Sequence, residues 1–191
     1  MHHITGWITS FDRHLYQPLL MDRGDEIKVS PPGLNKCEMK FISALRFYCE
    51  GRNGGDPSAR RLFLLRNLTK SEGIGFFNTS GFYPDFILWI KDGNHQRIVF
   101  VEPHGMRNDD APPHNPKVEL YIALKELSDR IAQRDGPKGA RLDSYIVSAT
   151  PFHELRKRWG GVWTREDFAG KHVLFENDLN AKMTLLVEGD G

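Results

Sequence analysis

Two apolar runs lie on either side of Asp92-Gly93-Asn94. Residues 86–90 and 98–101 are built from β-branched, aromatic and leucine side chains, which favour strands. An Asp-Gly pair between two such runs is a strong signal for a β-hairpin. We therefore predict two antiparallel strands joined by a tight turn.

Polar residues lie at the ends of both predicted strands: Pro84-Asp85 opens the first, and Glu102-Pro103-His104 closes the second. Side chains alternate along a strand, so Glu102 and His104 share a face. If the turn closes the hairpin symmetrically, Asp85 and Glu102 come close together at one end of the sheet. Two carboxylates at that distance repel each other and cost stability.

A bound divalent cation would remove this repulsion, and oxygen ligands favour magnesium or manganese. The backbone carbonyl of Pro103 could supply a further oxygen. The sequence therefore predicts a metal site at the open end of the hairpin.

The other predicted elements alternate between helix and strand along the chain. Asn35 caps a helix that reaches about Cys49, and Asn115-Pro116 opens a second helix that ends before Gly136. We predict further strands at residues 62–65, 144–149, 173–175 and 183–187, and a short helix at residues 155–159. This succession is typical of an α/β fold with a mixed sheet and helices packed against it.

A chain of 191 residues with 39% hydrophobic content suits one globular domain. Residues 1–33 hold few periodic apolar positions and are predicted to be an arm or lead-in, and residues 34–191 form the domain. There is no apolar run of about 18 residues and no leader-like start, so we expect a soluble, cytoplasmic chain without a membrane partner. Cys37 and Cys49 fall about 18 Å apart on one predicted helix and cannot bond to each other.

The net charge of +1 gives no overall field that would attract nucleic acid. The dense basic run Arg156-Lys157-Arg158 is interpreted as a solvated helix face. Affinity for a polyanion would therefore have to come largely from another domain or subunit.

The pattern of Pro84-Asp85 followed, after a hairpin, by Glu102-x-His104 resembles the PD-(D/E)xK nuclease superfamily. That superfamily has Pro-Asp, a variable gap, then an acidic residue, any residue and lysine. The wider pattern is similar to the nuclease end of type III restriction subunits and to nucleases attached to DEAD/DEAH-type helicases. The stretches that carry it are Leu34-Asn35 before a helix with Glu38, and residues 65–67, 75–77, 82–89 and 101–105.

The resemblance spans roughly residues 34–150 and, more weakly, 173–175. It implies a restriction-endonuclease-like fold, a mixed central sheet flanked by helices. It also implies that Asp85 and Glu102 bind the metal ion, magnesium or manganese, and take part in catalysis. Glu38 matches an acidic residue that many members place on the helix before the sheet. The alternative for Glu38 is a capping box with Asn35, three residues earlier.

His104 departs from the superfamily pattern, which has lysine at this position. An imidazole can hydrogen-bond a water molecule, act as a base near pH 7 or ligate a softer metal. It cannot supply the permanent point charge of lysine. The departure leaves three outcomes open: altered catalysis, a switch to manganese, or loss of activity.

Other candidates rest on weaker signals. Lys117 and Glu119 open the second helix and face the loop after the motif, with a solvated first turn as the alternative. Asp109-Asp110 in that loop is expected to face solvent, and Trp89 is expected to pack in the core.

The function expected from the resemblance is a divalent-metal-dependent endonuclease that hydrolyses DNA phosphodiester bonds. It would act as the nuclease module of a helicase-linked or restriction and defence system, with a helicase or translocase as partner. One alternative is a catalytically degenerate nuclease fold that binds nucleic acid or serves in assembly, and another is a nuclease acting on RNA. A homodimer is a further arrangement that the sequence leaves open.

Overall fold

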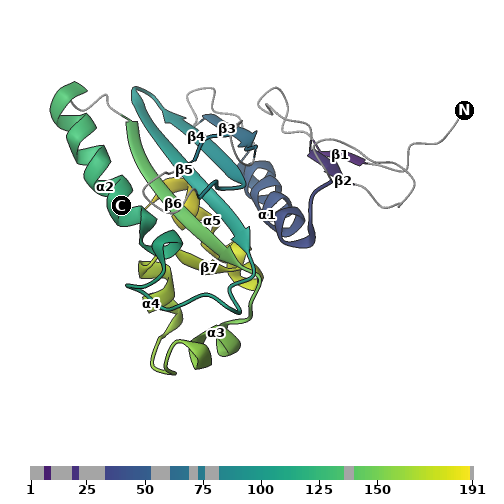
Figure 1. The fold of residues 1–191 in the computed structure, drawn as a ribbon. Coiled ribbons are helices and arrows are strands. Elements are labelled where there is room, and N and C mark those ends of the chain that lie inside the picture. The colour runs from purple at the N-terminus through teal and green to yellow at the C-terminus, as the bar shows by residue number, and fades with distance from the viewer. Residues whose placement is uncertain are drawn as a thin grey trace, which may run out of the picture.

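The centre of the molecule is a five-stranded mixed sheet in the order β3-β4-β5-β6-β7 (Figure 1). The structure is a computed structural model that describes residues 7–9, 19–21, 33–52, 61–68, 73–75, 82–135 and 140–189. Neighbours β3, β4 and β5 are antiparallel, whereas β5, β6 and β7 are parallel. The strands are β3 (Arg61–Arg66), β4 (Phe86–Asp92), β5 (His95–His104), β6 (Ala140–Ser148) and β7 (Val173–Phe175).

Helices cover both faces of this sheet (Figure 1). Helices α1 (Lys36–Arg52) and α5 (Leu179–Glu188) share the larger buried core with one face, and α2 (Pro116–Asp135) packs on the other. Helices α3 (Phe152–Arg158) and α4 (Arg165–Gly170) lie at the side of the molecule toward which the C-terminal ends of β5 and β6 point (Figure 1). The predicted α/β class with a mixed sheet is confirmed.

The β4–β5 hairpin pairs symmetrically from Asp92 with His95 to Phe86 with Val101. Gly93 in the turn has a φ of 55°, a conformation that glycine adopts without steric cost. The predicted hairpin is therefore confirmed. Its register places the start of β4 beside the C-terminal end of β5.

The predicted strand at residues 183–187 is wrong, because these residues belong to α5. The buried residues Leu179, Met183, Leu186 and Val187 are spaced by four, three and one positions, which places them on one face of a helix. A short apolar run fits a strand or a buried helix equally well by periodicity. The spacing back to Leu179 would have decided for a helix.

Helix α4 was not predicted, although its start carries a local signal. The Thr164 side chain accepts a hydrogen bond from Asp167 N, and the Asp167 carboxylate accepts one from Thr164 N, which forms a capping box. A Ser or Thr followed three residues later by an acidic residue is the sequence form of this cap.

Three smaller features concern the start of α2, the two cysteines and the helices as possible membrane spans. The amide oxygen of Asn115 accepts hydrogen bonds from Lys117 N and Val118 N, so Asn115 caps α2 as predicted. Cys37 and Cys49 form no disulfide with each other, as predicted. No helix among the described residues is long and apolar enough to cross a membrane.

In the predicted arm at residues 1–33, β1 (Trp7–Thr9) and β2 (Leu19–Met21) pair with each other in a separate two-stranded sheet. Most of the arm lies outside the described residues, so the division at residue 33 stays a prediction.

On its outer edge, β6 pairs with β7 only at residues 146–148. Over the earlier residues of β6, side chains contact the backbone at this edge instead. The Ser128 hydroxyl of α2 accepts a hydrogen bond from Leu142 N at 2.8 Å. Two residues further on, His172 Nδ1 lies 3.0 Å from the Ser144 carbonyl oxygen. These contacts occupy backbone groups that would otherwise be available for pairing.

Asp143 links this edge to the rest of the sheet. Its carboxylate lies 2.8 Å from His172 Nδ1 and 2.5 Å from the guanidinium of Arg97, and Arg97 also donates to the Leu186 carbonyl oxygen of α5 at 2.6 Å. The His172 ring stacks between Tyr121 and Tyr145. Hydrogen bonds and charge from His172 and Arg97 outweigh the effect of burial and hold the pKa of Asp143 below its ordinary value.

We expect Asp143→Asn to lower the free energy of unfolding at pH 7 by about 3 kcal/mol, because it leaves the largely buried side chain of Arg97, 11% exposed, without its counter-charge. Because the folded-state pKa of Asp143 is lowered, its contribution is present above the unfolded pKa and is lost as pH falls through the folded pKa. Urea unfolding should therefore show a gap between wild type and variant that closes below about pH 4. Asp129→Asn, an exposed site on α2, is the control and should change stability by less than about 0.5 kcal/mol. An equal loss in both variants would contradict the role given to Asp143.

Candidate functional site

The open end of the β4–β5 hairpin brings Asp85 and Glu102 together. Asp85 directly precedes β4, and Phe86 pairs with Val101, the residue before Glu102. Asp85 N donates a hydrogen bond to Glu102 Oε2 at 3.2 Å. The predicted approach of these two residues at one end of the sheet is confirmed.

Asn67, the residue after β3, holds the segment that presents Asp85. Its backbone N–H donates to the Asp85 carbonyl oxygen at 2.8 Å, and its side-chain amide donates to the Pro84 carbonyl oxygen at 2.8 Å. The position of Asp85 is therefore fixed from β3 as well as from β5.

The two carboxyl groups are both hard to ionise. Burial raises the pKa of Asp85 to about 6, and the nearby charge of Glu38 adds to the rise. Burial also raises the pKa of Glu102 to about 7, with the charge of Asp85 as the second cause. Buried like charges of this kind store repulsion that a cation relieves.

Lys117 in the first turn of α2 provides one such positive charge. Its ammonium nitrogen lies 3.6 Å from Glu102 Oε1 and 5.4 Å from the centre of the Phe82 ring. The charge of Lys117 lowers the pKa of Asp85 and Glu102 and so opposes the effect of burial. The solvated first turn considered for Lys117 is not what the structure has, because its side chain is turned to the carboxylates.

His104 ends β5 two residues after Glu102, and Glu102 and His104 therefore share a face as predicted. Its Nε2 atom lies 3.5 Å from Asp109 Oδ2. Burial lowers the pKa of His104, Lys117 lowers it further, and Asp109 acts in the opposite direction. The imidazole is therefore neutral at pH 7 and can accept a proton.

The prediction that the Asp109-Asp110 pair faces solvent is wrong for Asp109 and confirmed for Asp110. The Asp109 side chain is 21% exposed, whereas that of Asp110 is 75% exposed. Asp109 was missed because the contact with His104 depends on how the loop after β5 turns back, and its residue types do not specify that path.

Glu38 forms the capping box that was its alternative interpretation. Its Oε2 atom accepts a hydrogen bond from Asn35 N at 2.7 Å, and the Asn35 side chain accepts one from Glu38 N at 3.0 Å. The same carboxylate lies 3.6 Å from the guanidinium of Arg66. Its charge is felt by Asp85, so the residue borders the site, and its role as a metal ligand stays a prediction.

Arg66 was not predicted as a site residue. It is buried at the end of β3 and pairs with Glu38, and its charge lowers the pKa of Asp85. A usable signal was present, since Arg66 is a charged residue at the end of an apolar strand. That is the same pattern that singled out Asp85 and Glu102.

Within the described residues no group of three or more His, Cys, Asp or Glu side chains is arranged to hold a metal ion. Asp85 and Glu102 nevertheless fit magnesium, which is commonly held by one or two carboxylates together with water and substrate phosphate oxygens. Their raised pKa values indicate a pair that a cation would stabilise. Pro103 is buried between Glu102 and His104, and the role of its carbonyl oxygen stays a prediction.

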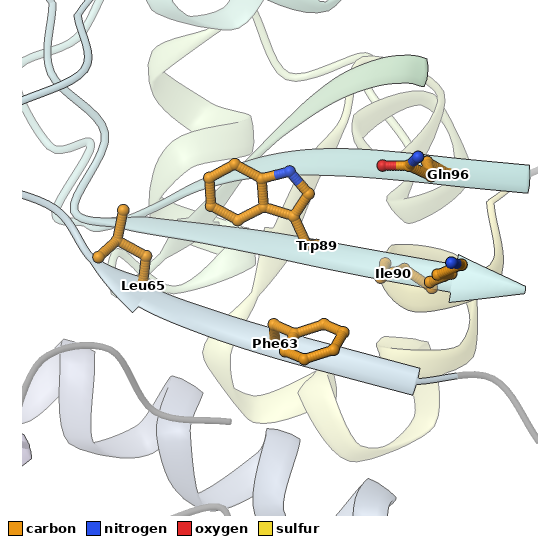
Figure 2. Close-up of a pocket in the computed structure, with 6 residues that line it drawn as sticks. Phe63, Leu65, Trp89, Ile90 and Gln96 are labelled. Carbon is orange, nitrogen blue, oxygen red and sulfur yellow. The ribbon is translucent and has the colours of Figure 1, made fainter. Parts of the chain in front are cut away.

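An apolar hollow of about 420 Å³ lies on β3 and β4 and extends to Lys91 and Gln96 at the turn end of the hairpin, away from Asp85 and Glu102 (Figure 2). Figure 2 shows Phe63 and Leu65 on β3 and Trp89 on β4 at this hollow. Phe63 pairs with Trp89, so both are on the face that carries Ile87. Trp89 is partly buried against the apolar cluster that contains Ile87, and it also lines the hollow. Its predicted core role is therefore confirmed only in part.

We expect Asp85→Asn to stabilise the metal-free protein at pH 8 by about 1 kcal/mol, less than the full pKa shift would give, because the side chain keeps some contact with solvent. The folded-state pKa of about 6 is above the ordinary value, so ionised Asp85 destabilises the fold, and wild type should gain stability as pH falls from 8 toward 5. Chemical denaturation in EDTA at several pH values measures this gain, which Asp85→Asn should reduce. Glu166→Gln, an exposed site on α4, is the control and should follow wild type.

The sequence matches no protein-family model, and it matches no curated protein at a significant level.

Proposed function

We propose that this chain is a divalent-metal-dependent nuclease that hydrolyses DNA phosphodiester bonds, with a site of the PD-(D/E)xK type. The observation that carries the proposal is the partly buried pair Asp85 and Glu102, with raised pKa values, beside the ammonium group of Lys117. Carboxylates that converge on one sheet end with a fixed cation suit the binding of a metal ion and a phosphate.

Asp85 and Glu102 would hold magnesium or manganese, with Glu38 and the Pro103 carbonyl as further proposed ligands. When bound, such an ion polarises a phosphate and lowers the pKa of a water molecule. The two carboxylates would then be ionised at neutral pH, since a nearby cation favours their charged form.

Lys117 supplies the charge that the superfamily motif places two residues after its acidic residue. In this chain that position is His104, and the ammonium comes instead from the start of α2, 3.6 Å from Glu102. We propose that Lys117 offsets negative charge on the scissile phosphate. His104, neutral at pH 7, would accept a proton from the attacking water.

The partner and the cellular role belong to the same proposal. The chain carries a net charge of +1, and phosphate contacts need several Lys or Arg side chains. A helicase or translocase, as a neighbouring domain or subunit, or a second copy of the chain would add the missing grip. The nuclease would then serve a helicase-linked or restriction and defence system.

A second function is a nuclease fold that has lost catalysis and binds nucleic acid or serves in assembly. The observation that favours it is the histidine in place of the motif lysine. The two functions differ in their response to metal, because a binding module should hold DNA equally well in EDTA and never nick it.

Incubation with supercoiled plasmid in magnesium, manganese or EDTA tests the proposed nuclease. We expect metal-dependent nicking that falls by at least about 10²-fold in Asp85→Ala and in Glu102→Ala, because each removes an oxygen ligand and a site charge. Asp92→Ala, an exposed acidic residue at the hairpin turn, should cleave like wild type. Nicking that persists unchanged in both site variants, with the fold intact by circular dichroism, would show that these carboxylates are structural.

Lys117→Met tests whether the ammonium group of Lys117 takes part in cleavage alongside the metal ion. We expect the cleavage rate at saturating metal to fall by about 10²-fold or more, the scale for loss of one charge-stabilising donor. Lys125→Met changes an exposed lysine on the same helix and serves as the control. Equal rates for Lys117→Met and wild type would exclude the role proposed for this ammonium group.

A further inference from the structure

The loop between β5 and α2, residues 105–115, is anchored in the protein from its first turn. Met106 is fully buried in an apolar cluster that includes Leu155 and Trp159. Asp109 N donates a hydrogen bond back to the Met106 carbonyl oxygen at 3.2 Å. The segment that carries Asp109 therefore has a defined path directly after the site strand.

The end of α3 holds the same segment through three side-chain hydrogen bonds. Arg158 Nε and Trp159 Nε1 both donate to the Asp109 carbonyl oxygen, at 3.0 and 3.2 Å. The Arg158 guanidinium also donates to the Asn108 carbonyl oxygen at 3.0 Å. All three bonds go to the backbone, so they fix where residue 109 lies without engaging its carboxylate.

The Asp109 carboxylate is left facing His104. Its Oδ2 atom is buried and has no hydrogen-bond partner among the described residues. The ring nitrogen Nε2 of His104 lies 3.5 Å from this oxygen, an ion-pair distance that is longer than an ordinary hydrogen bond. Buried polar atoms are rarely left unpaired, and His104 Nε2 is the ring nitrogen that lies within ion-pair range of this oxygen.

We propose that Asp109 is a positioning residue that fixes the orientation and tautomer of His104. In this arrangement Nε2 carries the hydrogen and donates it to Asp109 Oδ2, and Nδ1 is the nitrogen that accepts a proton. Arg158 of α3 and the next residue, Trp159, contribute indirectly, because they hold the backbone of Asp109 in place. This inference rests on the proposed nuclease function for its catalytic consequence, and on the loop geometry alone for the tautomer.

The proton balance of the proposed reaction gives Nδ1 its task. Nδ1 takes one proton from the attacking water, and the water oxygen forms the new bond to phosphorus. The phosphorus–oxygen bond to the leaving nucleoside breaks, and that oxygen takes up a proton from solvent. An imidazole whose other nitrogen is held by a carboxylate is oriented to take the proton from the attacking water. The aspartate of a Ser-His-Asp triad orients its histidine in the same way.

A double-mutant cycle on the full chain tests whether Asp109 acts through His104. We expect Asp109→Ala to lower the metal-dependent cleavage rate by about 10-fold or more. In a His104→Ala background the same change should have an effect of less than about 2-fold, because residues that act as a unit are not additive. Asp110→Asn, the exposed neighbour, should cleave like wild type. An equal loss from Asp109→Ala in both backgrounds would overturn the positioning role.

The tautomer of His104 can be read by long-range ¹H–¹⁵N NMR on the metal-free protein, without any cleavage. We expect a protonated Nε2 and an unprotonated Nδ1 in wild type and Asp110→Asn, and a mixture of tautomers in Asp109→Ala. Asp109→Asn keeps the side-chain size and provides the measurement if the alanine variant fails to fold. A protonated Nδ1 in wild type, or a tautomer that neither variant changes, would overturn the inference. If no metal supports cleavage, the proposed function fails while this spectrum still decides the inference.

Discussion

The register of the β4–β5 hairpin determines which side chains meet at the candidate site. A slip by one residue would turn every apolar side chain of the hairpin to the opposite face of the sheet. Each face carries a buried apolar cluster, under α1 and α5 on one side and α2 on the other, so the core selects a single register. That register sets Asp85 beside Glu102 whatever the electrostatic cost. The repulsion between the two carboxylates is thus imposed by the packing of residues that have no part in the chemistry.

The charges that balance this pair come from elements far apart in the sequence. Lys117 is provided by the first turn of α2, and Arg66 by the end of β3, where it also pairs with Glu38 of α1. Each cation meets its carboxylate partner only when the helices have packed on the sheet. The site is therefore a property of the assembled α/β fold, and no local motif contains it.

The sequence predicted the parts of the molecule that local signals specify. The Asp-Gly turn gave the hairpin, and the Asn115 cap gave the start of α2. Residues 183–187 were misassigned because a five-residue run with four apolar side chains does not distinguish a strand from a buried helix turn. Arg66 and Asp109 were missed for a different reason: each gains its significance from a partner that only the tertiary structure brings near. Glu38 shows the intermediate case, in which the capping box was readable from the sequence and the pairing with Arg66 was not.

The side-chain cover on β6 also decides where this sheet can grow. Ser128 and His172 bind the backbone of residues 142 and 144 along the edge, so an incoming strand would have to displace them. At the opposite border, β3 has β4 as its one strand neighbour within the described part of the chain. Of the two border strands, β3 is the longer, with six residues against three in β7, and it ends in Arg66. A partner that docked there by backbone pairing would reach the border of the carboxylate site without disturbing the far side of the fold.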